Sequence, residues 1–82
     1  MINRQWVLFH LSEAIEELQK VSTALESRAA LNKEEFEIAL EHAYHHINTA
    51  WNSREITDEE AKQHSDADFI RWRQFPAELN LS

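Results

Sequence analysis

Hydrophobic residues recur at alternating steps of four and three along the first third of the chain. This spacing places one apolar stripe along a helix, and it is the heptad spacing of helices that pack side by side. The pattern predicts a helix over about residues 3–28. The stripe consists of Val7, Leu11, Ala14, Leu18, Val21 and Leu25.

A second stripe with the same spacing follows after a short polar connection. Asn32 and Glu35 have the types and the separation of a helix N-terminal capping box, and they predict a second helix over about residues 33–54. Because the connection is short, we expect the two helices to fold back as an antiparallel hairpin. The second stripe consists of Phe36, Leu40, Ala43, Ile47 and Ala50.

Two further capping pairs stand in the remaining third of the chain. Thr57 with Glu60, and Ser65 with Asp68, predict short helices over about residues 58–64 and 66–75, the second ended by Pro76. The chain contains no glycine and no strand pattern. We therefore predict one all-α domain over residues 1–82, a long helical hairpin followed by one or two short helices.

One flank of the predicted hairpin is more apolar than two helices need. Heptad register places Leu8 opposite Trp51 and Ile15 opposite Tyr44 on this flank. Either the aromatic tail or a second copy of the chain should cover it, and two paired hairpins would form a dimeric four-helix bundle. The tail residues available for this are Phe69, Ile70, Trp72 and Phe75.

Exposed aromatic residues near the start of the first helix indicate a contact surface. Trp6 and Phe9 fall outside the first stripe, Leu8 lies beside them, and Trp72 stands between two arginines near the end of the last helix. Clusters of large aromatic side chains are typical of protein interfaces. These four residues are the predicted interaction surface, for a homodimer or for another protein partner.

The opposite flank of the hairpin is polar and carries most of the residues capable of chemistry. They are His10, Glu13, Glu17, His42 and His46. We interpret this flank as exposed histidine–glutamate ion pairs, which would raise histidine pKa values and make the fold more stable at mildly acidic pH. The alternative is a site for a divalent metal such as zinc, since two histidines four apart on a helix lie on one side.

Composition limits the remaining functions. Without cysteine or glycine the chain has no thiolate nucleophile, disulfide, glycine-bearing nucleophile turn or phosphate loop, so we predict no enzymatic activity and no cofactor. A net charge of −7 disfavours nucleic acid and acidic membranes as partners. No apolar run is long enough to span a membrane. The predicted function is a small, acidic, cytoplasmic interaction or regulatory module.

Overall fold

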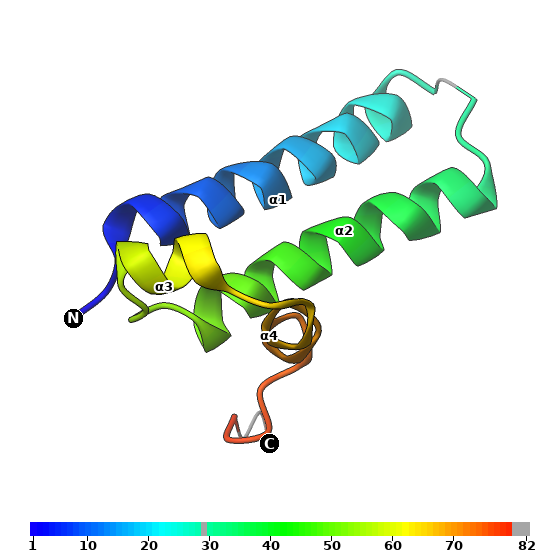
Figure 1. The fold of residues 1–82 in the computed structure, drawn as a ribbon. Coiled ribbons are helices and arrows are strands. Elements are labelled where there is room, and N and C mark those ends of the chain that lie inside the picture. The colour runs from blue at the N-terminus through cyan, green and yellow to red at the C-terminus, as the bar shows by residue number, and fades with distance from the viewer. Residues whose placement is uncertain (29, 80–82) are drawn as a thin grey trace.

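The computed structural model describes residues 1–28 and 30–79, and within them it contains helices and no strand. The predicted all-helical hairpin is confirmed, because the two long helices pack side by side (Figure 1). The last helix ends at Trp72, three residues before the predicted end. The helices are α1 (Arg4–Glu26), α2 (Lys33–Asn52), α3 (Asp58–Gln63) and α4 (Asp66–Trp72).

Side-chain caps begin both long helices. The Asn3 side chain accepts a hydrogen bond from the Trp6 backbone N–H at 3.2 Å, and the Asn32 side chain accepts one from the Glu35 N–H at 2.8 Å. These bonds pair amides that have no partner inside a helix. After α1 the chain turns at Arg28, whose φ of 57° lies in the left-handed region that glycine usually occupies.

Reciprocal capping boxes begin the two short helices, as the sequence predicts. In α3, Thr57 and Glu60 exchange side-chain-to-backbone hydrogen bonds of 3.0 and 3.1 Å. In α4, Ser65 and Asp68 do the same at 3.1 Å each. These local bonds stabilise helices that are too short to be stable through their own backbone hydrogen bonds.

The contact between α1 and α2 uses the small residues of the predicted stripes. Ala14 and Ala43 are 3% and 2% exposed, and Val21 and Ala50 are buried as well. The large residues of the predicted stripes are only partly buried, at 37–60% exposure, and Leu11 with Ile47 and Leu18 with Leu40 line hollows shared by the two helices. Small side chains let two helices approach closely. The partly buried residues are Leu11, Leu18, Leu25, Phe36, Leu40 and Ile47.

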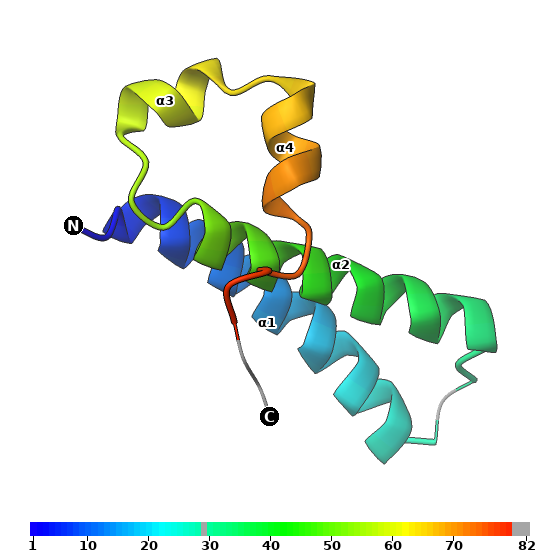
Figure 2. The ribbon, with the colours of Figure 1, turned by 90° about the horizontal axis from the view of Figure 1, so that it is seen from below.

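The two short helices form a second layer over one side of the hairpin, at the end where α1 begins (Figure 2). Within this layer, α4 packs against α2. The Asn48 side-chain amide donates to the Arg73 carbonyl at 2.9 Å, and the Asn52 amide donates to the Trp72 and Gln74 carbonyls at 2.6 and 2.7 Å. These bonds pair carbonyl groups at the end of α4, where the helix offers them no partner.

The two tail helices therefore cover the polar flank, and on the apolar flank the tail binds only at Trp51, whose indole N–H donates to the Glu78 carboxylate at 3.1 Å. Leu8 and Ile15 remain 64% and 60% exposed, and Tyr44 and Trp51 remain 48% and 37% exposed. The expectation that the tail would cover these residues is wrong. The physical reason is the pair of asparagine amides on α2, which bind the backbone at the end of α4 on the other side.

Candidate functional site

The most prominent surface feature is an uncovered apolar side of the hairpin. Successive residues of this set are three or four positions apart on each helix, so they share one side of it. Their side chains are 37–64% exposed. We call this surface the open apolar face. It consists of Leu8, Leu11, Ile15 and Leu18 of α1, and of Leu40, Tyr44, Ile47 and Trp51 of α2.

Two shallow hollows lie along the open apolar face. One, of about 290 Å³, is lined by Leu11, Ile47 and Trp51 together with residues near the chain termini. The other, of about 510 Å³, lies nearer the turn and is lined by Leu18, Leu40 and neighbours from α2. Hollows of this kind between adjacent helices are where side chains of another helix insert in ridge-into-groove packing.

The size of the open apolar face sets it apart from ordinary surface residues. Eight large side chains that are 37–64% exposed leave roughly 700 Å² of mostly apolar surface in water. The largest apolar patch on a typical monomer is about 300–600 Å². A stable protein–protein interface buries about 800 Å² from each partner. The open apolar face is therefore of the size of an interface.

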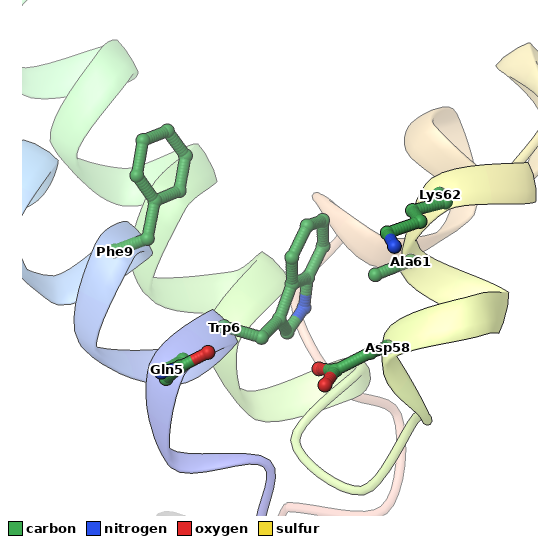
Figure 3. Close-up of a pocket in the computed structure, with 6 residues that line it drawn as sticks. All are labelled: Gln5, Trp6, Phe9, Asp58, Ala61 and Lys62. Atoms are coloured by element: carbon green, nitrogen blue, oxygen red, sulfur yellow. The ribbon is translucent and has the colours of Figure 1, made fainter.

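A second surface feature is a groove between the start of α1 and α3. Its volume is about 540 Å³, with Trp6, Phe9 and Ala61 in its wall and Gln5 and Lys62 among its polar neighbours (Figure 3). Asp58 completes the lining. The groove is wide and mixed in character, and it lies apart from the open apolar face.

The four residues of the predicted interaction surface do not form one surface in the structure. Leu8 belongs to the open apolar face, and Phe9 is 53% exposed beside the groove of Figure 3. Trp72 is only 7% exposed and packs edge-on against Trp6, with ring centres 6.2 Å apart. The Trp6 indole N–H donates to the Ser53 hydroxyl at 2.8 Å. Both tryptophans therefore serve the internal packing of the chain.

Two histidines of the polar flank, the buried His10 and the half-buried His46, meet in the structure. His10 is 6% exposed, and its Nδ1 lies 2.9 Å from the Nδ1 of His46. One ring donates to the other, which requires both to be neutral or one to be protonated. The rings of Trp6 and His10 pack edge to face, with their centres 4.5 Å apart. His10 Nε2 is buried with no hydrogen-bond partner among the described residues.

Burial, as the largest cause, and the nearby His46 and His64 together lower the pKa of His10 to about 4. The prediction that ion pairs would raise histidine pKa values is wrong for this residue. Within residues 1–28 and 30–79, the structure forms no ion pair between a histidine and a carboxylate. Glu17 instead lies 3.8 Å from Lys20 on its own helix.

The alternative of a metal site gains no support from the geometry. Among the described residues, no three histidine, aspartate or glutamate side chains are placed to hold one metal ion. Of the candidate ligands only His10 and His46 come together. His42 is exposed, while Glu13 and Glu17 are half-buried. Zinc sites in proteins take at least three protein ligands.

The buried histidine predicts how stability depends on pH. The folded pKa of about 4 lies below the unfolded value of 6.5, so the unfolded chain binds more protons between these values. The contribution of His10 to the free energy of unfolding is therefore fully present above pH 6.5, and it is lost as the pH falls toward 4. At pH 4 the loss should be on the order of 3 kcal/mol.

Urea unfolding of the wild type and of His10→Leu across pH 4–8 measures this effect. Carboxylates contribute to acid unfolding in both proteins, so the difference between the two curves isolates His10. We expect the wild type to lose stability relative to His10→Leu below pH 6.5. Parallel curves over the whole range would show that His10 does not titrate as described.

Comparisons with protein families, with curated proteins and with solved structures find no match for this chain. In the part of the chain that the structure describes, every helix is too short or too polar to cross a membrane.

Proposed function

We propose that this chain is a small, acidic, non-catalytic interaction module that docks onto protein through its open apolar face, by self-association or by binding another protein. The observation that carries the proposal is the exposure of Leu11, Leu18, Leu40 and Ile47, large residues in heptad positions that are 37–46% exposed in the single chain. In a helical protein, such residues normally lie between packed helices.

The distribution of small and large residues supports the proposal. The hairpin closes on alanines, with Ala14 and Ala43 almost fully buried, while leucines on the same helices face outward. A chain whose only purpose was to fold alone would gain more from burying the leucines, because burial of each is worth about 1.5–3 kcal/mol. Leucines that face outward gain the same burial energy when the surface of a partner covers them.

The histidine pair fits a structural role better than a catalytic one. The Nδ1 atoms of His10 and His46 bind each other, and His10 is 6% exposed. A general acid or base has to reach the proton of a substrate directly or through one water. The histidine pair instead joins α1 to α2 beneath the second layer.

Binding of an apolar fluorescent dye such as anilinonaphthalene sulfonate tests whether the open apolar face is a docking surface. At nanomolar protein concentration, where any partner copy has dissociated, we expect the wild type to bind the dye with enhanced fluorescence. The double variant Leu11→Asp with Leu18→Asp should lose most of this signal, because it places charge in both hollows.

Phe9→Asp is the matched control, since it also replaces a large, half-exposed apolar residue of α1 by aspartate. Phe9 lies beside the groove of Figure 3 and outside the open apolar face. We expect this variant to keep the dye signal of the wild type. Equal losses in both variants, or no dye binding by the wild type, would contradict the proposed docking surface.

A further inference from the structure

We propose that the partner of the open apolar face is a second copy of this chain, bound in reversed orientation, so that each α1 packs antiparallel on the partner's α1 and each α2 on the partner's α2. The inference rests on the proposed function. The resulting assembly would be a two-fold four-helix bundle with its two hairpin turns at opposite ends.

The spacing of residues along α1 fits this reversed arrangement. If Ile15 lies on the two-fold axis, residues equally distant from it along the helix face each other. Leu8 then faces the partner's Ser22, and Leu11 lies beside the partner's Leu18. A large side chain opposite a small one packs without a gap or a clash, as interdigitated layers require.

On α2 the two-fold axis passes between Ala43 and Tyr44, and residues equally distant from it again face each other. Ile47 then faces the partner's Leu40, and Trp51 faces the partner's Phe36. Leu40 and Ile47 both line the hollow nearer the turn, while Ile47 and Trp51 line the other. Each hollow therefore receives a large apolar side chain from the partner, which buries the surface that the single hairpin leaves exposed.

Charges at the ends of α1 favour the reversed arrangement. Arg4 continues the α1 stripe one turn before Leu8, and Glu26 lies one turn beyond Ser22. In the reversed arrangement Arg4 meets the partner's Glu26, twice per dimer. On α2 the same arrangement places Arg54 opposite the partner's Lys33, a like charge that is offset by Glu37, which lies 3.8 Å from Lys33.

The other two-fold arrangement, with both turns at one end, pairs different residues. It would place α1 on the partner's α2 in the same register as within one hairpin. Leu8 would then face the partner's Trp51, and Arg4 would face the partner's Arg54 in place of the partner's Glu26.

Disulfide trapping tests the arrangement, and the chain is suited to it because it has no cysteine of its own. Under a glutathione redox buffer, Ile15→Cys should form a covalent dimer with itself. A mixture of Leu8→Cys and Ser22→Cys chains should form the mixed dimer. Disulfides need Cα atoms within about 7 Å, so only residues that face each other will react.

Two matched controls make the test decisive. Lys20→Cys lies on the same helix as Ile15 with its side chain exposed, but away from the open apolar face, and should stay monomeric under the same buffer. A mixture of Leu8→Cys and Trp51→Cys chains should give no mixed dimer. If that mixture reacts while Ile15→Cys does not, the turns lie at one end and the reversed arrangement is overturned.

The test also separates this inference from the proposed function. A wild type that binds the apolar dye when dilute but stays monomeric at high micromolar concentration would remove the second copy as the partner. The docking surface itself would stand in that case. A wild type that neither binds the dye nor associates would remove both proposals.

Discussion

Trp72→Ala is expected to detach the two short helices from the hairpin. Trp72 is the one large aromatic residue among those described that is fully buried, at 7% exposure. Its indole packs edge-on against Trp6 and lies 5.6 Å from the ring of His64. Replacing a buried tryptophan by alanine usually costs about 3–5 kcal/mol. The total stability of a small domain is often only about 5 kcal/mol.

Amide hydrogen exchange and urea unfolding would measure this loss. The hydrogen bonds from the side-chain amides of Asn48 and Asn52 to the end of α4 remain possible in the variant. Hydrogen bonds that become exposed to water contribute little to stability. We expect the amides of α3 and α4 to lose their protection while those in the middle of α1 and α2 retain it. The urea midpoint of unfolding should fall in proportion to the lost free energy of unfolding.

Phe69→Ala is the matched control, because Phe69 is an aromatic residue of the same helix that is 46% exposed. Its removal deletes less buried area, and we expect a loss of about 1 kcal/mol or less. If both variants lose the same stability, Trp72 is not the anchor of the second layer.

The paired substitution of Leu11 and Leu18 by aspartate is expected to abolish self-association. Both residues line hollows of the open apolar face and are 40% and 42% exposed in the single chain. In a dimer the two substitutions occur in both copies, so four carboxylates would be desolvated without partners. Each unpaired buried charge costs several kcal/mol in practice, and association should weaken by at least about a thousandfold.

Sedimentation velocity of this variant beside Phe9→Asp would measure the effect. Because Leu11 and Leu18 are already part-exposed in the single hairpin, we expect the helical circular dichroism of the monomer to change little. Phe9→Asp carries the same kind of substitution beside the groove of Figure 3 and should associate like the wild type. A Phe9→Asp monomer alongside an associating double variant would move the interface to that groove.

The heptad pattern predicted the hairpin but not which edge of each stripe would be buried. The apolar stripe on α1 is wide enough that two neighbouring lines of residues could face α2. One contains Ala14 and Val21, and the other contains Leu11 and Leu18. Heptad spacing alone does not indicate which of the two lines faces α2. The answer depends on whether the leucines pack against a surface outside the hairpin, and the sequence pattern of one chain carries no information about such a surface.

The position of the tail was missed for a different reason. Apolar content suggested that the aromatic tail would cover the apolar flank, yet α4 is held by the side-chain amides of Asn48 and Asn52 on the other side. The sequence did contain a signal for this position. Asn48 and Asn52 stand four positions apart on α2, and the short helix α4 that follows has no glycine after it. The two side-chain amides can bind carbonyl groups that the end of that helix leaves unpaired.

The histidine flank was located correctly, but its environment was not. The sequence places His10 and His46 on one flank, and in the structure they meet there. Nothing in the sequence indicates that Trp6 and the second layer bury His10, and burial reverses the direction of its pKa shift. Long-range packing decides such shifts, because the same imidazole behaves oppositely in water and beneath aromatic rings.

Sedimentation equilibrium of the wild-type chain measures pairing through the open apolar face without any substitution. The measurement belongs near physiological ionic strength of about 0.15 M, where salt screens the repulsion between two acidic copies. From low to high micromolar concentration, we expect the mass to rise from one chain of 9.7 kDa to twice that value, with no larger species. A chain that keeps its monomer mass at high micromolar concentration would contradict pairing through the open apolar face.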